Sequence, residues 1–233
     1  ISREADDDSR RQDYNSAIPK YLEAISYYPE FTQAYFQLAK AFYSLGDYNQ
    51  AKDYLLKCLE LDPNQIQPLM MIATIYKKLK DNESSERYYR KAVQVDPSSY
   101  KAHFRLGTLL MRKDLKLAKL SLEETVRLND KYYNGHETLG IVNMQLGNIN
   151  EAINNFMKTI DVLGERSKKR YKSLYLLADI YNTKKEYEKA REYAQSAVDI
   201  RENGGAANYH LGVAYKNLGE NYLAKNAFER ASK

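Results

Sequence analysis

Prolines at a fixed interval are the feature that most limits how this chain can fold. Pro29, Pro63 and Pro97 lie 34 residues apart and close three similar phrases, Ala-Ile-Ser-Tyr-Tyr-Pro, Cys-Leu-Glu-Leu-Asp-Pro and Ala-Val-Gln-Val-Asp-Pro. A proline cannot continue a helix, and it pushes the preceding residue out of the helical region. Each proline therefore marks the end of one structural unit, and the fixed period predicts an array of stacked repeats.

Each period holds two amphipathic helices joined by a short turn. Apolar side chains recur at helical spacing at Tyr35, Leu38, Ala39 and Phe42 and again at Ala51, Leu55 and Cys58, which places each set on one face of a helix. Between the two stripes, Gly46 can adopt the left-handed conformation that ends a helix. Asp47 can cap the next helix, with Gln50 completing a capping box.

Small residues recur where the two helices of a pair must approach closely. They are Ala39, Ala73, Gly107, Gly140, Ala178 and Gly212 in the first helices, and Ala51, Ala118, Ala152, Ala190 and Ala224 in the second helices. Together with the Leu-Gly or Leu-Ala pairs, the tyrosines and the closing prolines, this pattern resembles the tetratricopeptide repeat. The resemblance covers nearly the whole chain and implies an all-α, right-handed superhelical solenoid of antiparallel helix pairs.

The repeat residues predict a polar, acidic segment at residues 1–11 and an array of about six and a half repeats at residues 12–233. Only the second helix of the first repeat is expected, and Pro19 is expected to bend or fray it. The run Arg166 to Arg170 is expected to lengthen a helix by about one turn. The predicted repeats are 12–31, 32–65, 66–99, 100–132, 133–166, 167–204 and 205–233.

Composition sets limits on the class of protein. The 233 residues are 43% hydrophobic and carry a formal net charge of +5, which is modest for a nucleic-acid-binding protein. No apolar run approaches the length of a membrane span, so no membrane insertion is expected. One cysteine excludes an intrachain disulfide, and Cys58 is expected to be a packing residue. The chain opens with Ile1 and closes inside a repeat, which favours a fragment of a longer protein. The alternative interpretation is an array whose uncapped terminal repeats contact another subunit. The compartment is not predicted.

No constellation typical of an enzyme or a metal site is present. His136-Glu137 begins a phrase similar to the zinc-protease motif His-Glu-x-x-His, but Gly140 occupies the place of the second histidine. His103 and His136 are instead expected to pack as aromatic residues do at this position. We therefore expect no catalytic residue, no metal and no cofactor.

The resemblance implies that side chains of the first helices line a concave groove for an extended peptide or a helix of a partner protein. By position, the groove residues would be Phe36, Gln37, Lys40, Tyr43, Met70, Met71, Thr74, Lys77, Lys101, Phe104, Arg105, Thr108, Met111, Arg112, Glu137, Ile141, Tyr175, Asp179, Tyr209 and His210. Their first half is basic with apolar surface between the charges, and their second half is mixed. The expected partner is an acidic and apolar segment, and the expected role is a non-enzymatic scaffold or adaptor within a larger assembly.

The family's clamp for a C-terminal carboxylate is not predicted. Lys101 and Arg105 match two of its residues, but Phe36, Lys40 and Met71 occupy the other positions.

Other interpretations remain open. The chain could be a structural array that self-associates through terminal repeats, in particular through Leu223 and Phe228. RNA binding is less favoured, because helical-repeat RNA readers present small polar residues on each repeat. The basic run from Arg166 to Arg170 could be a docking patch for an anion, or simply a solvated segment.

Overall fold

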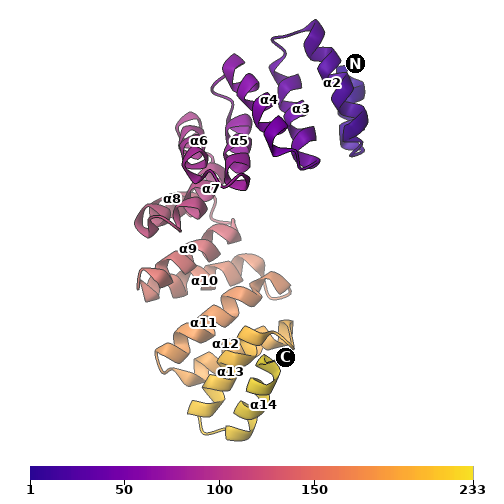
Figure 1. Cartoon of the computed structure of the whole chain (residues 1–233). Coiled ribbons are helices and arrows are strands. Elements are labelled where there is room, and N and C mark those ends of the chain that lie inside the picture. Colours follow the sequence, from indigo (N-terminus) through magenta and orange to yellow (C-terminus); the bar gives the residue numbers. More distant parts are fainter. Residues whose placement is uncertain (233) are drawn as a thin grey trace. The chain divides into compact units, whose positions relative to one another are not determined.

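The computed structural model describes residues 1–232, and within them the chain forms fourteen α-helices, one short 3-10 helix and no strand (Figure 1). In chain order these are α1 (Ser2–Arg10), α2 (Tyr14–Tyr27), α3 (Thr32–Ser44), α4 (Tyr48–Leu61), α5 (Ile66–Lys78), α6 (Asn82–Val95), α7 (Tyr100–Leu110), α8 (Leu115–Leu128), α9 (Tyr133–Gln145), α10 (Ile149–Leu163), η1 (Lys168–Arg170), α11 (Tyr171–Thr183), α12 (Tyr187–Ile200), α13 (Gly205–Asn217) and α14 (Asn221–Ala231).

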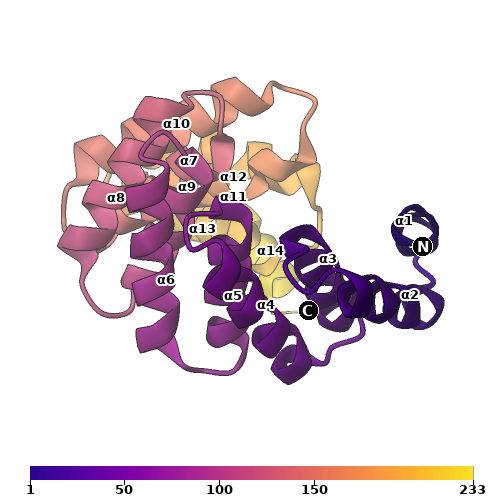
Figure 2. The same ribbon diagram turned by 90° about the horizontal axis from the view of Figure 1, so that it is seen from above.

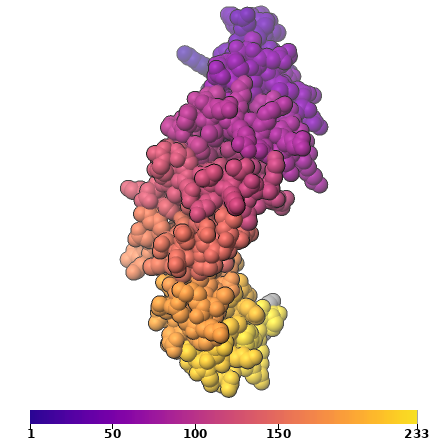
Figure 3. Space-filling model, turned by 90° about the vertical axis from the view of Figure 1, so that its left-hand side faces the viewer, coloured from indigo at the N-terminus to yellow at the C-terminus, as the bar shows by residue number. Residues whose placement is uncertain are grey.

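The chain divides into two compact units, Ile1–Leu110 and Met111–Lys233. In the first unit α1 packs on α2, α3 on α4, and α5 on α6, and α7 packs on α6 (Figure 2). In the second unit α8 packs on α9, and the pairs α9 with α10, α11 with α12, and α13 with α14 follow. Consecutive pairs within each unit follow one another in sequence order in the space-filling view (Figure 3). The all-α solenoid of helix pairs expected from the sequence is therefore confirmed.

In two helix pairs a glycine on the first helix lies against a phenylalanine on the second. A Cβ atom added at Gly140 in α9 would lie 2.7 Å from the Phe156 ring of α10. Gly212 in α13 has the same relation to Phe228 of α14. Two of the small residues predicted from the sequence, Gly140 and Gly212, are thus places where the helices approach closely.

The first helix of the array differs from expectation, because residues 2–10 form helix α1 where the sequence predicted a polar segment without a helical stripe. Ala5 is fully buried, and it lies 34 residues before Ala39, the small residue of the next pair. Helix α1 is held mainly by polar bonds. The Tyr21 hydroxyl of α2 donates to Asp6 Oδ1 at 2.7 Å, and Lys20 donates to Asp8 Oδ2 at 2.6 Å.

Helix α2 runs without interruption through Pro19, so the expected fraying is wrong, and the expected bend there stays a prediction. A second local expectation is corrected. The residues from Arg166 to Arg170 do not lengthen a helix. Instead, α10 ends at Gly164 in the left-handed region (φ +70°), and a 3-10 turn precedes α11, which has 13 residues like α9. A left-handed glycine stops α10 before the insertion, so the extra residues form a connection.

A left-handed residue precedes the second helix in most pairs. Gly46 has φ +84°, and Asp47 then caps α4 by accepting a bond from the Gln50 backbone N–H at 3.0 Å, as predicted. The equivalent residue in the next repeat is Lys80, which adopts φ +65° although it carries a Cβ atom. Such a conformation is unfavourable for a non-glycine residue.

We therefore expect Lys80→Gly to stabilise the first unit by about 0.5–1 kcal/mol. Glycine removes the cost of the left-handed conformation, and this gain exceeds the loss caused by the greater conformational entropy of glycine in the unfolded chain. The effect is measured as a shift in the urea midpoint of unfolding, monitored by hydrogen exchange of the α5 and α6 amides. The control is Arg87→Gly inside α6, which should destabilise by about 1 kcal/mol. Equal loss of stability in both variants would contradict the prediction.

Candidate functional site

The inner helices of the first unit carry positive charge without negative charge. Helices α3, α5 and α7 contain no aspartate or glutamate, and they hold Lys40, Lys77, Lys78, Lys101 and Arg105. Their partner helices α4 and α6 contain residues of both signs. We call the solvent-facing side of α3, α5 and α7 the inner face of the first unit. Helix α1 is not included, because it carries Glu4, Asp6, Asp7 and Asp8.

The structure places most of the predicted groove residues of this unit where a ligand could reach them. Lys40, Lys77, Lys101 and Arg105 are exposed, and Gln37, Tyr43, Met70, Met71, Thr74, Phe104 and Thr108 are half-buried. Phe36 is an exception, because only 8% of it is exposed and it packs in the core with Ala39 and Leu55. The expectation that Phe36 supplies binding surface is therefore wrong. Its position on the helix turns it towards α4 and α5.

A buried tyrosine connects the outer helix α6 to the inner face. Tyr89 is 1% exposed, and its hydroxyl lies 2.9 Å from Thr74 Oγ1 of α5. Thr74 in turn donates to the Met70 carbonyl at 2.9 Å, which leaves its oxygen to accept from Tyr89. Burial raises the pKa of Tyr89, although the Thr74 bond and the nearby Arg105 charge lower it in part. The phenol therefore stays protonated and holds α5 in place beneath Arg105.

Three cations of this face, Lys40, Lys101 and Arg105, are not neutralised by neighbouring carboxylates. Lys40 Nζ donates to Gln37 Oε1 at 2.8 Å and lies 5.6 Å from the centre of the Phe36 ring. Lys101 Nζ lies 5.9 Å from the Tyr100 ring centre. Within residues 1–232, neither lysine nor the Arg105 guanidinium has a carboxylate within ion-pair distance. Cations on the outer helices are paired more often, as Lys57 is with Glu60 at 2.7 Å.

The inner helices of the second unit carry charges of both signs, and one pair of them is neutralised. Lys172 Nζ lies 3.1 Å from Glu137 Oε1, and the Ser173 hydroxyl donates to the other oxygen at 3.5 Å. Asp179 Oδ1 lies 3.7 Å from His210 Nδ1. Burial lowers the pKa of His210, and the Asp179 charge opposes this shift only in part. The histidine is therefore mainly neutral near pH 7, so it does not cancel the charge of Asp179.

The remaining predicted groove residues are spread over the second unit. Tyr175 stacks on the His210 ring at 6.4 Å between centres, and Tyr209, which is 54% exposed, meets the same ring edge-on. Ile141 packs against the core of α10 and α11. Met111 and Arg112 follow α7 but belong to the second unit, so they are not part of the inner face of the first unit.

A polar cavity of about 350 Å³ opens between α1, α2 and α3. Two of its residues, Gln37 and Lys40, were predicted to line the groove. The residues not predicted from the sequence are Asp6, Ser9, Arg10, Tyr14, Tyr21, Ala41 and Ser44. A signal for three of them was present, because Asp6, Ser9 and Arg10 lie 34 residues before Lys40, Tyr43 and Ser44. Because residues 1–11 are acidic and lack an apolar stripe, they were not recognised as a first helix in register with the later repeats.

Tyr21 fastens α1 to the wall of this cavity. It is fully buried, and besides its bond to Asp6 its hydroxyl lies 3.1 Å from Ser9 Oγ. Burial is the main cause that raises the pKa of Tyr21 to about 12. The pKa of Tyr21 is higher in the folded than in the unfolded chain, so its protonated hydroxyl stabilises the fold. This stabilisation is complete below pH 10 and is lost as the pH rises through 12.

We expect Tyr21→Phe to lower the exchange protection of the α1 amides about fivefold, because it removes a hydrogen bond worth about 1 kcal/mol. Hydrogen exchange followed by mass spectrometry of residues 2–10 measures this. Tyr14→Phe is the control, since the Tyr14 hydroxyl makes no hydrogen bond within the described residues. Unchanged protection in Tyr21→Phe would show that α1 does not depend on this bond.

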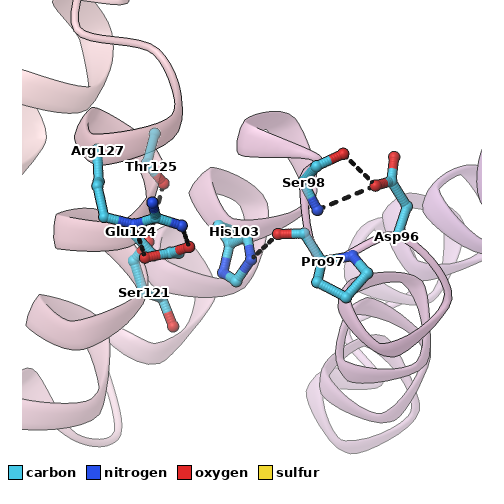
Figure 4. Close-up of polar contacts among 8 residues, drawn as sticks. All are labelled: Asp96, Pro97, Ser98, His103, Ser121, Glu124, Thr125 and Arg127. Carbon is cyan, nitrogen blue, oxygen red and sulfur yellow. Dashed lines mark hydrogen bonds and ion pairs between the residues drawn. The ribbon is translucent and has the colours of Figure 1, made fainter.

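The histidines and the cysteine have structural environments. Figure 4 shows His103 Nε2 donating to the Pro97 carbonyl at 3.1 Å, and His136 makes the equivalent bond to the Asp130 carbonyl at 2.9 Å. Cys58 is fully buried, and burial together with the Asp62 charge raises its pKa to about 11, so the thiol is protonated at neutral pH. Within residues 1–232 no group of three or more histidine, cysteine or acidic side chains could hold a metal ion. No helix in that range is long and apolar enough to cross a membrane.

Comparison with protein families matches two tetratricopeptide repeat models to the chain, one at residues 32–65, 66–99 and 205–233 and the other at residues 133–203. No curated protein matches it in sequence.

Solved structures share the fold at low sequence identity. The C-terminal part of a TPR repeat-containing protein from Cytophaga hutchinsonii is 16% identical with a TM-score of 0.82, over 99% of this chain and 94% of that one. A tetratricopeptide repeat protein from Parabacteroides merdae is 18% identical with a TM-score of 0.71, over 99% and 90%. YrrB, described as a TPR protein with an unusual peptide-binding site, is 22% identical with a TM-score of 0.69, over 80% and 95%.

Proposed function

Because the chain belongs to the tetratricopeptide repeat family, whose repeats are protein-interaction scaffolds, we propose that it binds an acidic and apolar segment of a partner protein. The segment lies on the inner face of the first unit, along α3, α5 and α7. The observation that carries this proposal is the absence of any acidic residue from these three helices, whose lysines and arginine face solvent. A partner segment that brings carboxylates supplies the missing charge.

Affinity and orientation come from different side chains. Half-buried Met71, Phe104 and Tyr43 offer apolar surface that a partner can cover, and methionine adapts to partners of varied shape. Lys101 and Arg105 are one helical turn apart on α7, and a guanidinium can hold a carboxylate with two bonds. Long-range attraction to the basic face also speeds encounter with an acidic partner.

A display library of random 12-residue peptides, panned against the chain, tests the proposal. Enriched peptides should combine Asp or Glu with large apolar residues. Their affinity should fall about tenfold or more in Lys101→Glu/Arg105→Glu, since each charged hydrogen bond contributes about 1.5–3 kcal/mol.

The chain offers a matched control in Arg87→Glu/Lys91→Glu, which changes the same residue types at the same spacing on the outer helix α6. Circular dichroism verifies that both double variants keep the helix content of the wild type. If the α6 variant loses as much affinity as the α7 variant, binding depends on net charge alone and the assignment to the inner face fails.

Self-association through the last helix pair is a second candidate, favoured by exposed apolar side chains there. Tyr222 is 76% exposed and Leu223 41%, beside a hollow of about 510 Å³ lined by Phe228 and Ala224 of α14 and Lys216 of α13. Sedimentation equilibrium of wild type and Leu223→Lys tests it. A concentration-dependent mass that the substitution abolishes would support an array that pairs with itself.

A further inference from the structure

The cavity between α1 and α3 exists because one repeat position changes size. Ser9 stands 34 residues before Tyr43 and 68 before Lys77, so a small hydroxyl occupies the place of a long side chain in the two following repeats. The result is an opening of about 350 Å³, within the size range of small-ligand sites.

Charges of opposite sign line this cavity without pairing across it. Asp6 Oδ1 accepts the Tyr21 hydroxyl, and no lysine or arginine of residues 1–232 lies within ion-pair distance of its carboxylate. Lys40 Nζ donates to Gln37 Oε1 and likewise lacks a carboxylate partner in that range. Arg10 lines the same wall and is paired only with the exposed Asp7 at 3.0 Å, a surface pair of small energy.

We propose that this cavity binds a small zwitterion, the ammonium and carboxylate head of a free α-amino acid. The ammonium donates to Asp6, and the carboxylate accepts from Lys40, with Arg10 able to exchange its Asp7 bond for a second contact. The Gln37 amide and the Ser9 hydroxyl supply neutral partners. A purely anionic ligand would leave Asp6 beside a like charge, and a purely cationic one would face Lys40 and Arg10.

The proposal does not require peptide binding along α5 and α7, although the cavity shares Gln37 and Lys40 of α3 with the inner face. Glycine and L-glutamine serve as probes, added to the full chain with ¹⁵N labelling. Saturable shifts of the Gln37 side-chain amide and of the α1 amides are expected, with a dissociation constant of about 1 mM for at least one probe. No saturation by either probe up to about 20 mM overturns the proposal.

Analogues that lack one charge separate the alternatives. N-acetyl-L-glutamine lacks the ammonium and L-glutaminamide lacks the carboxylate, and each should bind about tenfold more weakly than L-glutamine. Binding of N-acetyl-L-glutamine as tight as that of glutamine would mean a site for anions alone, which overturns the zwitterion assignment. Equal binding of L-glutaminamide would mean a site for cations alone and overturns it as well.

Variants test the residues. Asp6→Asn can still accept from Tyr21, and Lys40→Gln keeps a polar side chain, so both should fold and lose about tenfold in affinity. Ser9→Tyr introduces the side chain of the next repeat and should fill the cavity and abolish binding. Asp53→Asn and Lys57→Gln on α4 are the charge-matched controls. Wild-type affinity in Ser9→Tyr would place the ligand elsewhere.

Failure of this inference is distinguishable from failure of the proposed function. The peptides recovered by panning are measured in the same variants, together with Lys101→Glu/Arg105→Glu. Loss of peptide binding in the α7 variant with no amino-acid binding in the wild type would leave the proposed function standing and remove the cavity. Amino-acid binding in the wild type without any loss of peptide binding in the α7 variant would leave the cavity standing and remove the proposed function.

Discussion

Replacing Phe156 with alanine is expected to lower the free energy of unfolding of the second unit by about 3–5 kcal/mol. Phe156 is fully buried in α10 and packs with Leu177 and Ile180 of α11, so its ring joins two helix pairs. Removing it leaves a cavity at the junction. Because neighbouring repeats stabilise one another in such arrays, the loss extends beyond one pair.

Hydrogen exchange measured at increasing urea concentration gives a separate midpoint for each helix and therefore for each unit. The adjacent Met157 is 47% exposed, and Met157→Ala should change stability by no more than about 0.5 kcal/mol. A similar midpoint shift in the two variants would contradict the role given to Phe156.

The second large effect is expected for Gly140→Ala, which should destabilise the same unit by about 1–3 kcal/mol although alanine is the better helix former. The new Cβ atom would lie 2.7 Å from the Phe156 ring, and that ring is enclosed on all sides. Something in the pair must shift, and neither the ring nor the helix backbone can do so without cost.

Gly212→Ala provides an internal comparison, because its Cβ atom would lie equally close to Phe228. Phe228 is half-buried in the last helix of the array, so its ring can move and the loss should be smaller. Phe156→Leu should recover part of the stability of Gly140→Ala in a double-mutant cycle. Equal losses at the two glycines, or no coupling in the cycle, would contradict the steric account.

The period of 34 residues predicted the helix pairs because it reports packing that every repeat must satisfy. The small residues at Gly140 and Gly212 were predicted for this reason and lie where the two helices approach closely, and Ala39 is fully buried. Helix α1 escaped prediction because it is held by polar bonds from Asp6 and Asp8 to its neighbour. A search for periodic apolar residues does not detect a helix that is held by polar side chains.

The candidate site was predicted only in part, because a repeat position does not fix the exposure of a side chain. Phe36 shares its position with Met70 and Phe104 but is buried, whereas those two are half-buried. The basic character of α3, α5 and α7 was readable from composition. The cavity could not be predicted from composition, because it depends on Ser9 of α1 lining the same space as Gln37 and Lys40 of α3.

The most direct measurement of the central claim is site-specific photo-crosslinking of an acidic and apolar peptide recovered by panning. A photoreactive phenylalanine analogue replaces half-buried Met71 on the inner helix α5 in one variant and exposed Gln94 on the outer helix α6 in another. The account predicts that the peptide is captured from position 71 and not from position 94. Capture from position 94 alone, or equally from both, would show that the partner does not bind on the inner face of the first unit.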